Sequence, residues 1–240
     1  MGDMTTLTLV IPTYNLGHYF DETLQTIADQ TVEFELWLVD DHSTDGTAEK
    51  ASDFVSGRPT FHVERFKQHR GVSAARNFGL AHATGDVIAF ADGDDQLDPD
   101  YVKTLVNGFK NGVVAVAVGY LWWHTTIDQR NVYLPMSQRE MFKQVSHRGT
   151  DVGGYIWNKA YSLAAIREAN LQFDESLSIA EDYLFTASYV AKTPGVYVYD
   201  PALRYTKVNR PGSTIHTRNL HDQRVEEQVF SYIRRLGESI

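Results

Sequence analysis

The sequence has no cysteine and no long apolar run. Without cysteine, the chain has no disulfides, thiolate metal sites or cysteine nucleophiles. No stretch of about 18 uninterrupted apolar residues is present that would span a bilayer. Lys and Arg number 22 against 31 Asp and Glu, and the formal net charge of -9 disfavours non-specific binding to nucleic acid or anionic lipid. Residues 1–12 lack the charged start and apolar core of a signal peptide, so we expect a cytoplasmic protein with at most peripheral contact to the inner face of the membrane.

The 240 residues contain no Pro-, Ser- or Gly-rich linker, which predicts a single domain. Short apolar segments alternate with helical patterns in the first part of the chain. This order predicts an α/β fold with βαβ units and a mostly parallel central sheet flanked by helices, whose ligands bind at the carboxyl ends of the strands. The predicted strands are Leu7 to Pro12, Phe34 to Asp40, Phe61 to Phe66 and Val87 to Asp92.

Acidic residues follow two of these strands. Asp40 and Asp41 close the second, and Asp92 and Asp94 close the fourth. Aspartates at this density raise one another's proton affinity unless a cation relieves them. A divalent cation that bridges carboxylate and phosphate would do so, which favours a metal and nucleotide site at this sheet edge.

The second acidic cluster has two other interpretations. A calcium loop beginning at Asp92 fails, because Leu97 stands where the turn glycine belongs and Lys103 where the bidentate glutamate belongs. A turn that precedes a helix accounts for Asp98, which with Pro99 would cap that helix. It does not account for three acids at the ligand-binding edge.

The rest of the chain is less regular. An aromatic span after Tyr101 is more typical of substrate-binding loops than of a second core. The tail from Leu220 to Leu236 places apolar residues on one stripe and charged residues opposite, which predicts a surface helix packed on the domain.

An ordered set of motifs resembles the family 2 glycosyltransferases of the GT-A fold. The resemblance implies an inverting enzyme that moves a sugar, usually from a uridine diphosphate (UDP) sugar, to a hydroxyl of a glycan or lipid-linked acceptor, with Mn²⁺ or Mg²⁺ as cofactor. It implies one domain over 1–240, with a nucleotide-sugar half at about 1–112, an acceptor-side half at about 113–216 and a C-terminal helix at about 217–240. The matching segments are VIPTYN (Val10 to Asn15), LVDDHSTDGT (Leu38 to Thr47), Arg70 to Asp95, IWNKAYS (Ile156 to Ser162), FDESLSIAEDYLF (Phe173 to Phe185) and LRYTKVNRPGST (Leu203 to Thr214).

The same resemblance assigns the donor side of the site. Pro12 and Tyr14 would line the base pocket, and Asp41 would accept the uracil imide N–H. Asp40 is then a strand-end structural carboxylate, although the sequence leaves open which of the two aspartates reads the base. Arg76 would either reach the nucleotide or hold the Asp40 and Asp41 loop by an ion pair.

The resemblance also places the metal and the catalytic base. Asp92 would lie on the ribose or metal side, and Asp94 would bind the metal directly. Asp182 would take the proton of the acceptor hydroxyl, with Glu181 capping the following helix or orienting a neighbour. The alternative is that both acids only complement a helix dipole. A role for His216 at the diphosphate or metal is left open.

Four aromatic residues of the irregular span either stack on sugars or belong to the core. They are Trp122, Trp123, Tyr155 and Trp157.

Two other function classes compete with the transferase. A nucleotidyltransferase usually begins with a Gly-rich, basic phosphate loop, which VIPTYNLGHY lacks. A non-catalytic nucleotide-sugar or glycan-binding module would not need Asp92, Asp94 and Asp182 together.

Overall fold

The computed structural model describes residues 5–122, 130–210, 219–238 and 240. Its first half alternates strands and helices as expected. The elements are β1 (Leu7–Thr13), α1 (Tyr19–Ala28), β2 (Glu35–Asp40), α2 (Thr47–Val55), β3 (Phe61–Arg65), α3 (Val72–His82), β4 (Val87–Phe90), β5 (Gln96–Leu97) and α4 (Tyr101–Gly108).

The second half continues the same sheet. Its elements are β6 (Val113–Leu121), β7 (Leu134–Ser137), α5 (Gln138–Val145), β8 (Lys159–Ser162), α6 (Leu163–Glu168), α7 (Glu181–Lys192), β9 (Val196–Thr206) and α8 (Leu220–Gly237).

The four predicted strands of the first half are confirmed and pair in parallel in the order β3-β2-β1-β4. Strands β1 and β4 are apolar and almost wholly buried, because helices cover both faces of the sheet. Helix α3 packs closely on β1, since a Cβ atom added to Gly79 would lie 2.3 Å from a methyl carbon of Val10. A glycine is therefore required where this helix crosses the strand.

Strand β8 joins the two halves. It pairs antiparallel with β4 and with β6, and the sheet continues through β9 to β5, with β7 on β9. Strands β6 and β9 are parallel, whereas β5 and β7 run antiparallel to β9. One nine-stranded sheet therefore runs through the described residues of both halves.

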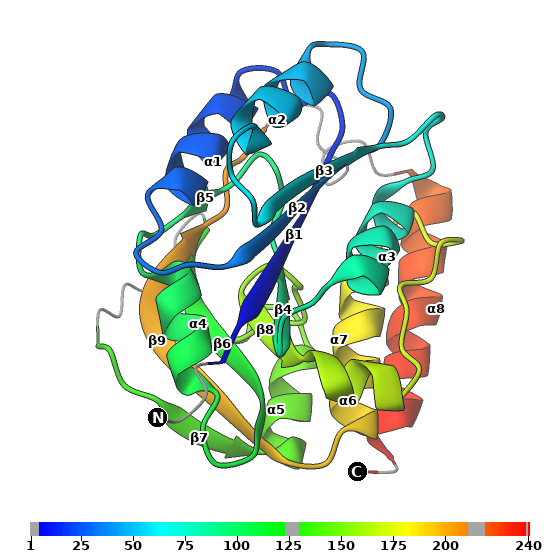
Figure 1. Ribbon diagram of the computed structural model, residues 1–240. Helices are drawn as coiled ribbons and strands as arrows, with labels where there is room; N and C mark the ends of the chain where they lie inside the picture. The colour runs from blue at the N-terminus through cyan, green and yellow to red at the C-terminus, as the bar shows by residue number, and fades with distance from the viewer. Residues whose placement is uncertain (1–4, 123–129, 211–218, 239) are drawn as a thin grey trace.

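Helices cover the two faces of this sheet (Figure 1). Helices α1, α2 and α4 lie on one side, and α3, α6, α7 and α8 lie on the other. Helix α8 packs on α7 through the predicted apolar stripe, with Val229 and Ile233 buried. The predicted C-terminal surface helix is confirmed.

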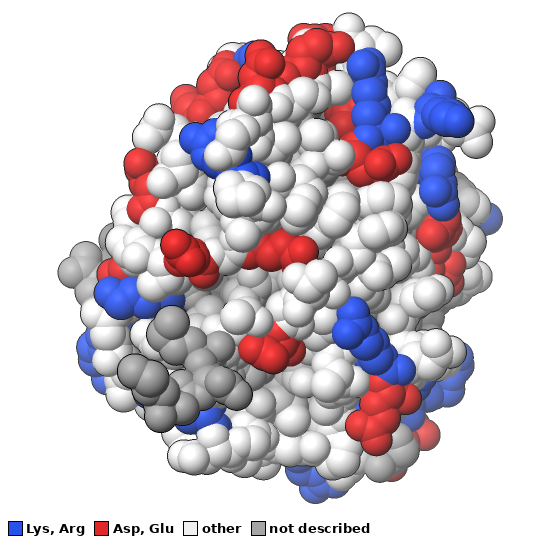
Figure 2. Space-filling view, in the orientation of Figure 1, with Lys and Arg blue, Asp and Glu red and all other residues white. Residues whose placement is uncertain are grey.

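Charge is unevenly distributed on the molecule. Figure 2 shows acidic side chains gathered over α1 and α2, where Asp21, Glu22 and Glu49 lie in the first helical turns. Among the helices of the described ranges, none is long and apolar enough to cross a membrane.

Candidate active site

The predicted site residues meet at one edge of the sheet. Strands β1, β2 and β4 end there, and Tyr14, Asp41 and Asp92 follow them. Strand β1 lies between β2 and β4: the chain runs outward from β1 through β2 to β3 and then crosses back past β1 to β4, so the strand order reverses here. Ligands of open α/β sheets bind at such a switch point.

The neighbouring aspartates after β2 have different surroundings. Asp40 is fully buried and accepts hydrogen bonds from the Ser43 backbone N–H (2.9 Å) and the Thr13 hydroxyl (3.2 Å). Asp41 accepts the backbone N–H groups of Arg70 (2.6 Å) and Gly71 (2.7 Å). Asp40 therefore shapes its own loop, and Asp41 holds the turn that begins α3. Base reading by Asp41 stays a prediction, to which the structure adds this anchoring role.

An aromatic pair lies beside Asp41. The ring of Tyr14 is 43% exposed, and its centroid is 4.4 Å from that of His69. His69 Nδ1 lies 2.9 Å from an Asp41 carboxylate oxygen. Pro12, half-buried, is the partner of Val39 in the β1–β2 register. The rings of Tyr14 and His69 are tilted by 36° to one another and offer aromatic faces on which a base can stack. No motif or spacing in the sequence singles out His69.

Arg76 links the two ends of the site. Its side chain is 5% exposed, and its guanidinium donates to Asp92 (3.1 Å) and to Glu181 (2.7 Å). Of the two roles predicted for Arg76, the ion pair with the Asp40 and Asp41 loop is not among the described contacts, because Asp92 and Glu181 hold the guanidinium. Contact of Arg76 with the nucleotide stays a prediction. Arg76 thus joins the loop after β4 to the start of α7.

The acidic cluster has a positive partner within the chain. The Lys207 ammonium lies 2.9 Å from Asp92, 2.9 Å from Asp95 and 4.0 Å from Asp94. Burial raises the pKa of Asp92, but Lys207 and then Arg76 outweigh it and lower that pKa to about 2. Burial raises the pKa of Asp95 to about 7 although Lys207 opposes the shift.

A second cation holds Asp94. Arg210 Nε lies 3.0 Å from an Asp94 oxygen, and its guanidinium also donates to the Asn15 carbonyl (3.1 Å). Sequence reasoning misses Lys207 and Arg210, although both lie in the quoted motif LRYTKVNRPGST. The available signal is two cations within four residues of the end of a strand, β9.

Asp182 is the second residue of α7. Its own carboxylate accepts the Tyr183 backbone N–H at 2.8 Å. Burial, and next the charge of Glu181, raise the pKa of Asp182 to about 7 although Arg76 opposes the shift. A carboxyl group with this pKa can accept a proton near neutral pH.

Glu181 orients Arg76 and does not cap the helix. The N-cap residue of α7 is Ala180, and no side chain of the described residues caps it. Ala180 adopts φ 61°, a left-handed conformation that costs a non-glycine residue about 1 kcal/mol or more. Such a backbone is typical of functional sites, and here it sets the direction in which Glu181 and Asp182 leave the chain.

Helix α4 begins differently from the expectation. Its N-cap is Asp100, whose side chain does not cap the helix, and Asp98 accepts the Asp100 N–H (3.0 Å) and binds Arg204 (2.7 Å). The prediction that Asp98 and Pro99 cap this helix is met in part: Asp98 accepts the Asp100 N–H through its carboxylate and the Tyr101 N–H (2.8 Å) through its carbonyl, although the N-cap residue itself is Asp100.

Of the aromatic residues of the irregular span that the structure describes, Trp157 belongs to the core, and Trp122 and Tyr155 are partly buried against it. Trp157 is buried between the rings of Tyr155 (4.8 Å) and Tyr205 (4.7 Å), so both its faces are covered. Trp122 packs edge-on against Tyr155. Trp123 and His216 lie outside the described residues.

A family comparison decides the class of protein. Residues 8–164, more than half of the chain, match the sequence model described as Glycosyl transferase family 2. The chain belongs to this family. The match runs from the second residue of β1 through β8, and with these strands it includes the edge that carries Asp41, Asp92 and Asp94.

Curated relatives of this family 2 chain carry transferase names. One is the uncharacterized glycosyltransferase EpsJ of Bacillus subtilis, 27% identical over 212 residues, which cover 85% of this chain and 61% of EpsJ. Another is the poly(ribitol-phosphate) beta-N-acetylglucosaminyltransferase TarS of Staphylococcus aureus, 26% identical over 87% of this chain and 36% of TarS. The chain thus spans less than two thirds of the length of either relative.

Solved structures share the fold of this family 2 chain. TarS residues 1–349 in complex with UDP-GlcNAc align with a TM-score of 0.72 at 22% identity, covering 93% of this chain and 65% of that one. The mannosyltransferase PcManGT of Pyrobaculum calidifontis, solved with GDP-Man and Mn²⁺, aligns with a TM-score of 0.66 at 21% identity, covering 98% and 65%. The expected GT-A fold is confirmed.

The residues present in this family 2 chain fit a divalent cation. Asp92, Asp94 and Asp95 each offer an oxygen, and these oxygens lie within 4.8 Å of one another. Carboxylate oxygens suit Mg²⁺ and Mn²⁺. Asp94 is the only one of the three with an oxygen for which the described contacts give no donor from another residue closer than 4.0 Å.

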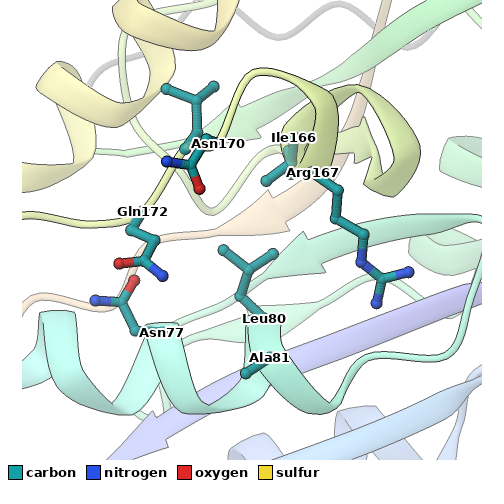
Figure 3. Close-up of a pocket in the computed structure, with 8 residues that line it drawn as sticks. Asn77, Leu80, Ala81, Ile166, Arg167, Asn170 and Gln172 are labelled. Carbon is teal, nitrogen blue, oxygen red and sulfur yellow. The ribbon is translucent and has the colours of Figure 1, made fainter.

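A separate cavity of about 200 Å³ lies between α3 and α6 (Figure 3). Figure 3 shows the amide groups of Asn77 and Gln172 pointing toward one another beside Leu80. Of the described residues that line the cavity, none carries a carboxylate and none is a predicted site residue. It therefore does not compete with the acidic edge as the site of sugar transfer.

Proposed function

We propose that this chain is an inverting glycosyltransferase that uses a nucleotide-diphosphate sugar, with UDP as the expected nucleotide. The acceptor is a hydroxyl of a glycan or lipid-linked molecule, and Asp182 is the general base. The division into a donor half, an acceptor half and a C-terminal helix, and the cytoplasmic location, stay predictions.

The observation that carries this proposal is the Arg76 bridge. It holds Asp92, on the donor side, and Glu181, next to Asp182, on one buried guanidinium. A sugar bound at the carboxyl edge of β4 would therefore lie near a carboxyl group whose pKa of about 7 suits proton transfer. The TarS structure was solved in complex with UDP-GlcNAc, which supports a UDP sugar here.

In the proposed reaction, the acceptor hydroxyl oxygen forms a bond to the anomeric carbon while the bond from that carbon to the diphosphate oxygen breaks. The electron pair of the broken bond leaves with the nucleoside diphosphate, and the hydroxyl proton passes to Asp182. Tyr14 and His69 would bind the base, and Asp41 would fix the turn beneath it.

Asp94 would hold the metal, with Asp92 beside it on the ribose or metal side. When bound, the cation would neutralise the charge that develops on the departing diphosphate. Lys207 supplies a further positive charge at the same place.

A panel of nucleotide sugars tests the function. We expect metal-dependent hydrolysis of one donor, and protection against thermal unfolding by the same donor. Asp94→Ala should abolish turnover with Mn²⁺ and cost little stability, because relief of the repulsion from Asp92 offsets the lost ion pair with Arg210.

Two results would contradict the proposal. One is the lack of hydrolysis and of thermal protection for every donor. The other, which would overturn the metal assignment alone, is near wild-type turnover by folded Asp94→Ala protein.

A further inference from the structure

Lys207 is held in place at both ends. Its backbone N–H donates to the Leu121 carbonyl at 2.9 Å. The antiparallel register that pairs Gln96 with Thr206 brings the adjoining residues, Asp95 and Lys207, to face one another. The Lys207 side chain is only 13% exposed. Its ammonium is thus a fixed charge at the acidic cluster and not a mobile surface group.

The three carboxylates of the cluster are not equally available. Asp92 has one oxygen on Arg76 and the other on Lys207. Asp95 is fully buried; one of its oxygens accepts from Lys207 and from the Tyr205 hydroxyl (2.6 Å), and the other accepts the Val208 N–H (2.8 Å).

Asp94 differs from both. One of its oxygens binds Arg210, and the other lies 4.0 Å from Lys207, beyond hydrogen-bond distance. Lys207 thus forms hydrogen bonds with two of the three possible metal ligands, Asp92 and Asp95, and leaves Asp94 without one.

These contacts set the conditions for metal binding. Mg²⁺ and similar ions keep several waters and bind through one or two carboxylates together with substrate phosphates, so a site with few free carboxylate oxygens binds them tightly only when phosphate oxygens are added. A fixed ammonium beside the remaining carboxylate also repels a divalent cation. The oxygens that the free protein can offer are therefore too few, and diphosphate oxygens would supply the rest.

We propose that Lys207 is a resident cation that prevents a divalent cation from binding tightly to Asp92, Asp94 and Asp95 until a nucleoside diphosphate is present. This inference rests on the proposed donor and metal site. Lys207 is then a positioning residue, which makes metal binding depend on the donor.

Binding of Mn²⁺ to the purified chain, measured by electron paramagnetic resonance of the free ion with and without UDP, tests this role. The wild type should bind Mn²⁺ weakly alone and more tightly with UDP. Lys207→Met should bind Mn²⁺ without UDP at least about tenfold more tightly, since one nearby positive charge is removed. The gain in Mn²⁺ affinity that UDP brings should shrink accordingly.

Two control variants separate the position of the charge from charge in general. Lys207→Arg keeps the positive charge and should behave as the wild type. Lys103→Met removes a lysine that is 47% exposed and pairs with Asp100 at 3.2 Å, so it should leave Mn²⁺ binding unchanged.

Melting temperature gives a second readout. Loss of the ammonium leaves carboxylates unpaired, so Lys207→Met should melt lower, and Mn²⁺ should raise its melting temperature by more than it raises that of the wild type. If Lys207→Met does not fold, the double variant Asp95→Asn with Lys207→Met removes one charge of each sign and takes its place in the Mn²⁺ titration.

The outcomes separate the two proposals. Equal Mn²⁺ affinity of the wild type and folded Lys207→Met in the absence of UDP overturns the role of Lys207 alone, provided that UDP still tightens binding. If UDP does not tighten Mn²⁺ binding to the wild type, or if Asp94→Asn binds as well as the wild type with UDP, the metal site itself is wrong, and the inference falls with it.

Discussion

Replacing Asp182 with asparagine separates catalysis from folding at this site. The change keeps the shape of the side chain, and an amide oxygen can still accept the Tyr183 N–H that Asp182 accepts at 2.8 Å. It removes the ability to take a proton. We expect transfer to fall by about 10² to 10⁴-fold, while donor affinity with Mn²⁺ changes far less, because the diphosphate leaves from the opposite face of the anomeric carbon.

The pH dependence of the wild type follows from the same residue. With a pKa of about 7, Asp182 is the ionised base in about a tenth of molecules at pH 6, so the transfer rate should be about a tenth of its plateau there. The Asp182→Asn variant should lack this acid limb in its residual activity.

The free energy of unfolding should change with pH in a direction that a purely structural role of Asp182 does not predict. The pKa of Asp182 is raised on folding, so the folded chain binds more protons than the unfolded chain between about pH 4 and pH 7. This contribution to wild-type stability is lost as pH rises through that window, at a cost of at most about 4 kcal/mol. The variant avoids the cost, so urea unfolding should show it more stable relative to the wild type at pH 8 than at pH 4.

The opposite pattern would refute the assignment. A carboxylate that only complements the start of α7 predicts a loss of about 1 kcal/mol at pH 8 with transfer nearly intact. Rate, calorimetric donor affinity and urea unfolding on this one variant distinguish the two roles.

Two further substitutions test the neighbours of this residue. Glu181→Gln should shift the acid limb of the pH–rate profile to lower pH, because the Glu181 charge is, after burial, the largest cause that raises the pKa of Asp182; an unmoved limb would contradict this coupling. Asp41→Ala should lower the free energy of unfolding by about 1.5–3 kcal/mol, since its carboxylate accepts two backbone N–H groups. If Asp41 also reads the base, calorimetry should show UDP binding weakened more than cytidine diphosphate binding, and equal weakening would exclude that role.

The fold of this protein and the edge at which it binds ligands can be predicted from the residues alone. Apolar runs such as Leu7–Thr13 and Val87–Phe90 predict buried parallel strands, because such runs are stable only when both faces of the strand are covered. The position of Asp41, Asp92 and Asp94 directly after strands then places them together, since parallel strands end at one edge.

The pairing of charges, by contrast, depends on the tertiary structure. Arg76 lies 105 residues from Glu181, and Lys207 lies 115 from Asp92. Local periodicity contains no information about contacts at such separations, so sequence reasoning does not find the Arg76–Glu181 ion pair and passes over Lys207. The antiparallel pairing of β5 with β9 brings Lys207 to the acidic cluster, and the start of α7 brings Glu181 to Arg76. The aspartates of the cluster are close together in the sequence and repel one another. In the folded protein, cations from distant segments lie beside them and offset this repulsion.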